Sequence, residues 1–367
     1  MSGFILAINP GSTSTKIGLF SGNKCLLKRD LNHDIAELDK LADQKEQIEL
    51  RLKYIREFLT VAETEGTAAI SKIDLIMARG GLIGPVSSGV YVINEAMKQV
   101  LSSEFYGSHA SNLGALIADR LSQEIGKPAY IADPPSVDEM SPVARYSGLK
   151  SIERLSLFHA LNHKAAAREA ASIIGHAYEE LQLIVCHMGG GISVGLHSRG
   201  RVVDVNNALE EGPMSPERAG SLPSLSLLRQ FSESGSEPDQ FRKVINGRGG
   251  LVSYTGSANE KELEAAMQLN HGYKEAIDAM IYQIIKEIGA LAAIASGCVD
   301  AIVLTGGLAK SDYVCGEIEQ KTNFIARIIR IPGERELQAL AAAGLRLLAG
   351  GTKPLNYDIP CDMEECR

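Results

Sequence analysis

Short apolar segments separated by polar, glycine-containing turns open the chain. Residues 4–8 are apolar, residues 9–16 read Asn-Pro-Gly-Ser-Thr-Ser-Thr-Lys, and residues 17–20 are largely apolar again. This pattern predicts a strand, a tight turn and a second strand, which together form a β-hairpin. Backbone N–H groups and the Lys16 ammonium of such a turn can bind a phosphate, and its oxygens can bind a metal on that phosphate. A polar turn without a ligand has the same pattern, and the P-loop spacing, GxxxxGKS or GxxxxGKT, is absent.

The same pattern returns later in the chain. An apolar run at 183–186 leads into His187-Met188-Gly189-Gly190-Gly191, and further strand-like segments follow at 194–196 and 201–205. A buried-type strand at 301–304 then runs into Gly306-Gly307. Two similar hairpins in separate halves, with a later strand ending in paired glycines, predict two related lobes that face one nucleotide.

Helical patterns alternate with these strands. Further strands are predicted at 73–77 and 128–132, and helices are predicted at 39–65, from 94, and at 112–124, 156–174, 260–295 and 334–348. Strands interleaved with helices indicate an α/β fold. A change of character near Ser147-Gly148 predicts a first lobe of residues 1–147 and a second of residues 148–334. The last segment, 335–367, is expected to return to the first lobe.

Composition narrows the class of protein. A chain of 367 residues is too long for one simple core, which favours two domains. A net charge of −8 argues against general nucleic-acid binding, and no apolar run reaches the ~18 residues that a membrane span needs. The N-terminus enters a strand without a basic leader, so we expect a cytoplasmic protein. The six cysteines lack CxxC spacing and read mostly as reduced core residues; Cys361 and Cys366 are either a disulfide or two free thiols.

The residues that can do chemistry lie at predicted strand ends and helix starts. Arg79 follows a strand and precedes two glycines, so it is either an anion clamp or a surface arginine. Asp133 ends a strand before Pro134-Pro135 and is either a site residue or a turn cap. Arg218 lies in a long polar loop, residues 210–220, with two prolines, which is typical of a functional loop.

Three histidines have positions suited to an anionic ligand. His159 and His163 are spaced i, i+4, so a helix would place them on one face. They either donate a hydrogen bond to a phosphoryl oxygen or are core histidines whose ring nitrogens are hydrogen-bonded within the protein. A zinc site of the zincin type is not expected, because the glutamate that it requires after the first histidine is missing. His109 precedes a predicted helix N-terminus, which is a natural anion site.

Nine segments together resemble the motifs of the acetate/butyrate kinase family over nearly the whole chain. They occur in this order: INPGSTSTK, ARGG, SHASNLGA, ADPPSVDEM, LFHALNHKAA, HMGGGISVG, EEGPMSPERAG, LTGGLAKS and IPGERELQALAAAG. Where acetate kinases carry HLGNG and a motif like FDTAFH, this chain has HMGGG at 187–191 and ADPPS at 132–136. These departures favour the butyrate branch of the family.

The resemblance implies the two-domain acetate and sugar kinase/Hsp70/actin fold, which is ribonuclease H-like, with a nucleotide cleft between the lobes. It implies reversible phosphorylation of butyrate by ATP to give butyryl phosphate and ADP, with Mg²⁺ as the metal. Branched-chain or other short-chain acids are the alternative acceptors. It also implies a homodimer or larger homo-oligomer whose partners are a carboxylate and a nucleotide, without nucleic acid or membrane.

Carried over by position, the family's site residues fall into four groups. The resemblance assigns catalysis to Arg79, Asp133, His159 and Arg218, and substrate or phosphoryl binding to His109, Arg79 and His187. It assigns ATP binding to Ser12, Ser14, Lys16, Gly189, Gly190, Gly191, Gly306 and Gly307. It assigns the metal to Asn9 and Glu336, with Glu334 as the alternative to Glu336. Sugar kinases and Hsp70- or actin-like ATPases share the implied fold and remain the competing functions.

Overall fold

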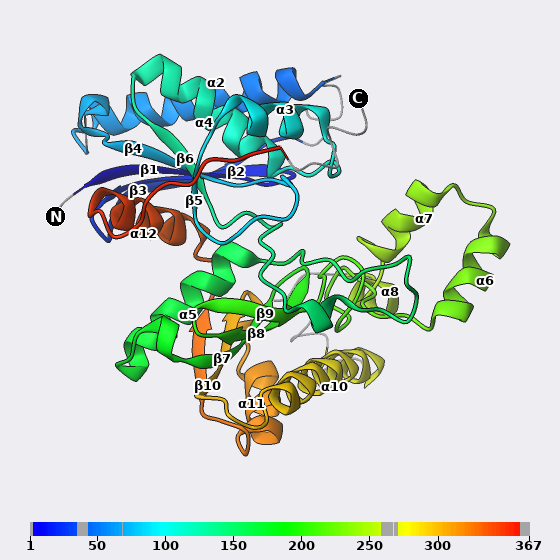
Figure 1. The fold of residues 1–367 in the computed structure, drawn as a ribbon. Coiled ribbons are helices and arrows are strands. Elements are labelled where there is room, and N and C mark those ends of the chain that lie inside the picture. The colour runs from blue at the N-terminus through cyan, green and yellow to red at the C-terminus, as the bar shows by residue number, and fades with distance from the viewer. Residues whose placement is uncertain (1–2, 35–42, 68, 258–266, 268–270, 360–367) are drawn as a thin grey trace. The chain divides into compact units, whose positions relative to one another are not determined.

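The computed structural model describes residues 3–34, 43–67, 69–257, 267 and 271–359 (Figure 1). These residues form two units, one of residues 1–137 and 335–367, the other of residues 138–334. The sequence predicted the divide after residue 147, but residues 138–147 pair with the second unit. The Ser141 amide donates to the Val203 carbonyl, and the Lys164 ammonium lies 2.6 Å from a Glu139 carboxylate oxygen.

The first unit is built on a six-stranded mixed sheet in the order β3-β2-β1-β4-β6-β5. The strands are β1 (Phe4–Pro10), β2 (Ser14–Ser21), β3 (Lys24–Asn32), β4 (Leu75–Arg79), β5 (Val90–Val92) and β6 (Ala129–Ala132). The predicted hairpin is present: β1 and β2 pair antiparallel from Phe4–Ser21 to Pro10–Thr15. β4 then pairs parallel with β1, and β6 pairs parallel with β4.

Helices cover both faces of this sheet (Figure 1). They are α2 (Gln44–Thr64), α3 (Glu95–Ser103), α4 (Asn112–Ile125) and α12 (Glu336–Leu348). Alternate side chains of β1 explain the two faces, because Leu6 and Ile8 join the core under α2 and α4, whereas Ile5 packs close to Gly344 of α12. The helix predicted from residue 94 is present as α3, and Asn94 caps it, since its side chain accepts a hydrogen bond from the Met97 amide.

The second unit repeats this plan with five strands in the order β11-β10-β7-β8-β9. The strands are β7 (Gln182–Met188), β8 (Ile192–Ser198), β9 (Arg201–Val205), β10 (Ala301–Gly306) and β11 (Ile328–Pro332). β7 and β8 form the second predicted hairpin, and β10 pairs parallel with β7 as β4 does with β1. The strand order β3-β2-β1-β4-β6 therefore recurs as β9-β8-β7-β10-β11.

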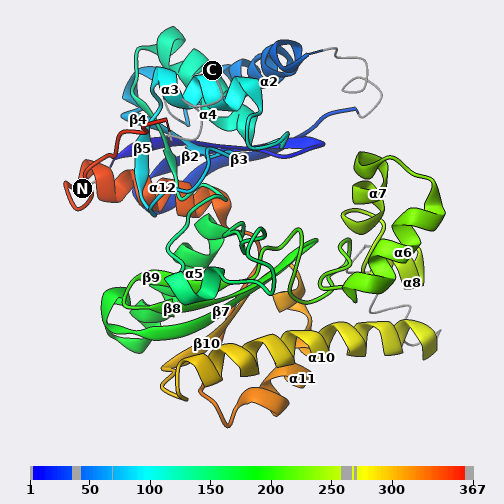
Figure 2. The same ribbon diagram turned by 45° about the vertical axis from the view of Figure 1, so that its right-hand side comes forward.

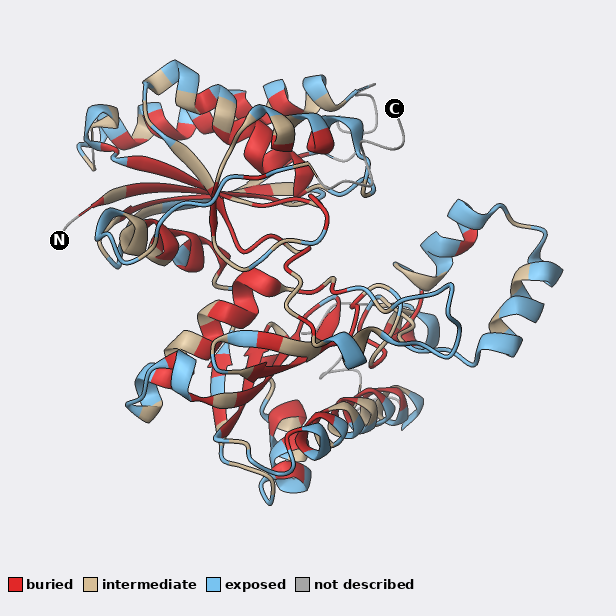
Figure 3. Ribbon diagram, in the orientation of Figure 1, coloured by how far each residue is buried: buried red, intermediate tan, exposed pale blue. Residues whose placement is uncertain are grey.

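The helices of the second unit are α5 (Ala160–Ile174), α6 (Ser224–Ser234), α7 (Pro238–Ile245), α8 (Leu251–Thr255), α10 (His271–Ile294) and α11 (Asp312–Thr322). Of these, α5 lies on one face of the sheet and α10 and α11 lie on the other, whereas α6 and α7 extend away from it, as the turned view shows (Figure 2). Alanines of α5 pack on Leu183 and Val185, while isoleucines of α10 pack on Ile184 and Cys186. Colouring by burial shows buried strands in both sheets and largely exposed residues on α6 (Figure 3).

Three expectations from the sequence need correction or fall outside the described residues. The helix predicted from residue 156 begins at Ala160, because His159 has non-helical backbone angles and caps it. Of the described cysteines, Cys186 and Cys315 are buried, but Cys25 and Cys298 are exposed, so the expectation of mostly core residues fails. Cys361, Cys366 and parts of the helices predicted at 39–65 and 260–295 lie outside the described residues.

None of the helices that the structure describes combines the length and the apolar character needed to cross a bilayer.

The packing of α4 on β4 yields the first testable prediction. A Cβ on Gly114 would lie 2.2 Å from the Arg79 carbonyl oxygen, so Gly114→Ala must push α4 away from the strand end. We expect this overpacking to lower the free energy of unfolding by about 1–3 kcal/mol, measured by thermal or urea unfolding. The matched helical control is Gly316→Ala in α11, where a Cβ meets nothing within 4 Å. That change should be neutral or stabilise by up to about 1 kcal/mol. Equal stability of the two variants would contradict the close approach.

Candidate active site

The turn of the first hairpin is closed by one short backbone hydrogen bond. The Gly11 amide donates to the Ser14 carbonyl at 2.7 Å, and Asn9 pairs with Lys16 where the strands begin. Ser12 is exposed at the tip, and Ser14 and Lys16 are half-buried. One internal bond cannot satisfy the remaining carbonyl groups of the turn, so other elements must supply donors.

Arg51 of α2 supplies these donors from beneath the turn. Its guanidinium is fully buried and donates to the carbonyl oxygens of Gly11, Ser12 and Ser14 at 3.0, 3.4 and 3.1 Å, and to the Thr15 hydroxyl at 2.8 Å. All four acceptors are neutral oxygens. Burial lowers the pKa of Arg51 to about 10, so the side chain remains charged at neutral pH. A buried positive charge therefore lies directly behind the predicted phosphate turn.

His33 supports the same turn from the end of β3. Its Nε2 lies 2.8 Å from the Thr15 hydroxyl, and its amide donates to the Thr13 carbonyl. Burial, followed by the nearby charge of Arg51, lowers the pKa of His33 to about 4. The ring is therefore neutral at physiological pH, which avoids a second positive charge beside the guanidinium.

Arg79, Asn9 and the start of α4 come together at the ends of β1 and β4. Arg79 is the last residue of β4, and its Nη1 lies 3.4 Å from the Asn9 side-chain oxygen. Gly114, in the first turn of α4, packs against the Arg79 backbone. The sequence placed Arg79 after the end of a strand, but it is the last residue of that strand, and α4 packs against its backbone.

Asp133 occupies a strained position at the end of β6. Its φ is +39°, which is unfavourable for a residue with a Cβ, and its side chain is buried. One carboxylate oxygen accepts hydrogen bonds from the Ser88 hydroxyl at 2.6 Å and the Gly89 amide at 2.9 Å. A buried aspartate held in such a conformation is typical of a functional site, and the role of Asp133 in the site stays a prediction.

The remaining predicted residues of the first unit lie at two helix starts. His109 is exposed before α4, and its Nδ1 lies 2.7 Å from the hydroxyl of Ser111, the N-cap residue. Glu336 is buried as the first residue of α12, where the helix dipole favours a carboxylate. Glu334, its alternative, is exposed and belongs to the second unit.

The turn of the second hairpin also depends on donors from another segment. The Gly190 carbonyl accepts the Ser215 hydroxyl at 2.6 Å and the Glu217 amide at 3.3 Å. A Cβ on Gly191 would lie 2.3 Å from an Arg218 guanidinium nitrogen, so this arginine lies flat against the turn. The loop predicted to be functional and the predicted phosphate turn are therefore one assembly.

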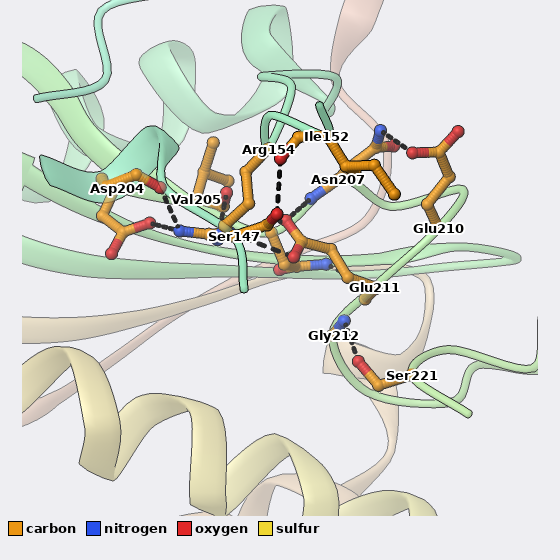
Figure 4. Close-up of polar contacts among 12 residues, drawn as sticks. Ser147, Ile152, Arg154, Asp204, Val205, Asn207, Glu210, Glu211, Gly212 and Ser221 are labelled. Carbon is orange, nitrogen blue, oxygen red and sulfur yellow. Dashed lines mark hydrogen bonds and ion pairs between the residues drawn. The ribbon is translucent and has the colours of Figure 1, made fainter. Parts of the chain in front are cut away.

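Figure 4 shows how the beginning of that loop is anchored. Arg154 forms ion pairs with Asp204 at 2.9 Å and with Glu211 at 3.1 Å. Glu211 also accepts the Asn207 amide, and the Gly212 amide donates to the Ser221 hydroxyl. Arg218 itself donates to the Ala208 carbonyl at 2.9 Å. The Arg218 side chain is thus held by Ala208, just before the loop whose beginning Arg154 fixes through Glu211.

The third glycine segment packs on the second hairpin. Gly306 has a φ of +91°, and a Cβ there would lie 2.3 Å from the Met188 carbonyl oxygen, so both conformation and space require glycine. Gly307 follows it and precedes a short 3-10 helix, Leu308–Lys310. The two predicted glycine segments of this unit therefore meet at the carboxyl ends of β7 and β10.

The two predicted histidines converge on one hydroxyl. His159 Nδ1 and His163 Nε2 each lie 2.9 Å from the Ser193 hydroxyl oxygen. The ring of His159 stacks on that of His187, with centroids 4.1 Å apart. His163 is fully buried and matches the core alternative, whereas His159 is only half-buried and is the better candidate for contact with a ligand.

Sequence reasoning missed several residues that support these groups. They are Arg51, His33, Ser88, Ser193 and Ser215. Arg51, His33, Ser88 and Ser193 lie far along the chain from the groups that they contact, and Ser215, although three residues from Arg218, is 25 residues from Gly190. The only sequence signal was that Ser193 and Ser215 fall within the quoted motifs HMGGGISVG and EEGPMSPERAG.

Comparison with known proteins gives consistent results. The profile of the Acetokinase family matches residues 145–325. Butyrate kinase 1 of Clostridium acetobutylicum is 44% identical over 355 residues, which cover 96% of this chain and 99% of that protein. A Listeria innocua protein named "Probable butyrate kinase" is also 44% identical, over 97% of this chain and all of its own length.

Solved structures show the same fold. The crystal structure of Porphyromonas gingivalis acetate kinase has a TM-score of 0.79 at 19% identity and covers 95% of this chain and 100% of its own. A propionate kinase from Francisella tularensis has a TM-score of 0.76 at 17% identity, over 93% of this chain and 98% of its own. The predicted α/β fold of the acetate kinases is therefore confirmed.

The neutral state of His33 makes stability depend on pH. Because its pKa is about 4 in the folded protein and 6.5 as the ordinary value, the unfolded chain binds the proton first. His33 thus stabilises the fold fully above about pH 6.5, and this contribution is lost as pH falls toward 4. We expect the melting temperature of the wild type to fall more steeply over this range than that of His33→Phe. The exposed His271→Gln serves as the control and should follow the wild type; parallel curves for all three proteins would refute the assignment.

Proposed function

Because this chain belongs to the acetokinase family, we propose that it phosphorylates butyrate with ATP to give butyryl phosphate and ADP, reversibly. Membership of the family makes the protein a kinase that uses a carboxyl group as acceptor. The observation that carries the choice of butyrate is 44% identity over nearly the whole length to proteins named butyrate kinases. The motif departures at 132–136 and 187–191 support the same choice.

The chemistry of a carboxylate acceptor explains the residues of the site. A short-chain acid has a pKa near that of Asp or Glu side chains, about 4, so it is already ionised at neutral pH. No base is needed to create the nucleophile, and the difficulty is to bring one anion up to another. Catalysis must then consist of positioning and charge neutralisation.

The charged and hydrogen-bonding side chains suit that task. We assign Arg79 and Arg218 to the oxygens of the transferred phosphoryl group, because guanidinium groups bind such oxygens in pairs. We assign His159 and His187 to phosphoryl contacts, and His109, at a helix start, to the anionic substrate. Asp133 orients its neighbours and does not remove a proton, which agrees with the hydrogen bonds from Ser88 and Gly89 that one of its oxygens accepts.

The glycine turns suit the nucleotide. We assign the first hairpin, with Ser12, Ser14 and Lys16, to the ATP phosphates, because it offers amides, hydroxyls and an ammonium above the buried Arg51 charge. The second turn, Gly189 to Gly191, lacks side chains that would keep a phosphate away from the backbone. Gly306 and Gly307 allow the same close approach to the remainder of the nucleotide.

Magnesium fits the oxygen donors of the first unit. Asn9 offers an amide oxygen and Glu336 a buried carboxylate, which are ligands that Mg²⁺ prefers. Among the described residues, no three His, Cys, Asp or Glu side chains form a closed cluster, so nucleotide phosphates would have to complete the coordination. When bound, Mg²⁺ would neutralise phosphate charge; we propose that Asn9 and Glu336 hold it.

A hydroxylamine-trapping assay tests the proposed function. Purified protein, Mg-ATP and a panel of acids from acetate to valerate, including isobutyrate, are incubated with hydroxylamine, and the hydroxamate is measured. We expect the highest kcat/KM with butyrate. A maximum at acetate or at a branched acid would keep the reaction and refute the substrate. Phosphorylation of a sugar instead of any acid would refute the carboxylate acceptor.

Arg51 provides a test of the phosphate turn. We expect Arg51→Met to raise the KM for ATP by about tenfold or more, because the turn loses four hydrogen bonds and the positive charge behind it. The KM for butyrate should change much less. Arg56→Met, on the same helix but exposed and paired with Glu124 at 2.6 Å, is the matched control and should behave as wild type. A lower melting temperature with an unchanged KM for ATP would reduce Arg51 to a purely structural residue.

A further inference from the structure

A chain of hydrogen bonds runs from His159 into the core of the second unit. The Ser193 hydroxyl joins His159 Nδ1 to His163 Nε2, with 2.9 Å at each link. His163 Nδ1 lies 3.2 Å from His197 Nε2, and His197 Nδ1 lies 2.7 Å from the Tyr178 hydroxyl. Apart from the half-buried His159, every member is buried. None of the inner members has a role in the proposed function so far.

We propose that this chain, from Tyr178 through His197, His163 and Ser193, fixes His159 as the tautomer that carries its proton on Nε2. His159 is the candidate phosphoryl ligand, and a ligand of phosphate oxygens must donate. The inner four residues are then positioning residues that act through His159. The donation of the Nε2 proton to a phosphoryl oxygen rests on the proposed function, whereas the assignment of the tautomer does not.

Each link of the chain holds one hydrogen. A neutral imidazole has one N–H and one acceptor nitrogen. His163 and His197 therefore each accept one hydrogen bond of the chain and donate the other. Burial lowers the pKa of His163 and of His197 well below the ordinary value of histidine, which keeps both rings neutral. The bonds through these two rings must therefore point in the same direction. The Ser193 hydroxyl has one hydrogen, and among the described residues its partners are His159 Nδ1 and His163 Nε2, so it donates to whichever of the two does not donate to it.

Tyr178 sets the direction in which the hydrogen bonds point. A phenol, with a pKa near 10, is a far stronger acid than the N–H of a neutral imidazole, so Tyr178 is the donor in its bond to His197 Nδ1. His197 Nε2–H then donates to His163 Nδ1, and His163 Nε2–H donates to Ser193. The Ser193 hydroxyl donates to His159 Nδ1, which leaves the proton of His159 on Nε2.

The ring of His159 is also held in place. The ring of His187 stacks on it with an interplanar angle of 26°, which restricts rotation of the His159 side chain. Its Nδ1 is fixed by Ser193. Because orientation and tautomer are set before a ligand arrives, the donor needs no reorganisation during the reaction.

Histidine nitrogen NMR tests the proposal on the full chain. In two-bond ¹H–¹⁵N spectra of the wild type, assigned with single histidine variants, we expect His159, His163 and His197 all to be Nε2–H tautomers. An Nδ1–H tautomer at any of the three histidines would refute the proposed direction of the hydrogen bonds. This measurement needs no substrate, so it stays independent of the hydroxamate assay: a failed proposed function and a failed tautomer assignment give different results.

Two variants test the order of the chain. In Ser193→Ala we expect His159 alone to lose its fixed tautomer, while His163 and His197 remain Nε2–H. In Tyr178→Phe we expect all three histidines to lose their fixed tautomers, because the donor that sets the direction of the hydrogen bonds is gone. Ser198→Ala, on the same strand β8, removes a hydroxyl that bonds Gln182 and is the matched control, with no tautomer changed. A fixed His159 tautomer in Ser193→Ala would refute the relay.

Kinetics separates positioning from structural support. Ser193→Ala and Tyr178→Phe should each lower kcat by about two- to tenfold, the range that one hydrogen bond supplies, with the KM for ATP unchanged. Ser198→Ala should leave both constants unchanged. A lower melting temperature with full turnover in the remaining folded protein would mean that the chain only stabilises the core.

Discussion

The site depends on one constraint: the turns of the two hairpins expose carbonyl groups that the turns themselves cannot satisfy. In the first unit a single buried arginine, Arg51, donates to three carbonyls and a hydroxyl of the turn. In the second unit Ser215 and the Glu217 amide donate to Gly190. Each of these hydrogen bonds contributes about 0.5–1.5 kcal/mol of stability, so the supporting donors fix the conformation of the turns before any ligand binds.

The two units solve this problem with different electrostatics, although their sheets have the same strand order. The first places a buried charge behind the turn and keeps the adjacent His33 neutral. The second uses a neutral serine behind the turn and holds its guanidinium, that of Arg218, against the backbone of Gly191. Positive charge therefore reaches both turns, from beneath in one unit and from the side in the other.

Close approach of backbone to backbone is the second recurring feature. Gly114 allows α4 to meet the end of β4 at Arg79, and Gly306 allows the end of β10 to meet Met188. In both places a Cβ would lie within 2.4 Å of a carbonyl oxygen. The glycines thus let neighbouring elements fix the strand ends that carry the functional groups, while Asp133 shows that the same edge of the first sheet tolerates strain.

The sequence by itself determined the two hairpins, the glycine turns, the α/β class and the family, because apolar periodicity and motif order are local or linear properties of the chain. It also located Arg79, Asp133, His159 and Arg218 as candidates. Only the tertiary structure decided what holds them. Arg51 lies 36 residues from Thr15, and His163 lies 30 from Ser193. Such pairs meet because helices pack on sheets, and no local pattern records which buried side chain will face which turn.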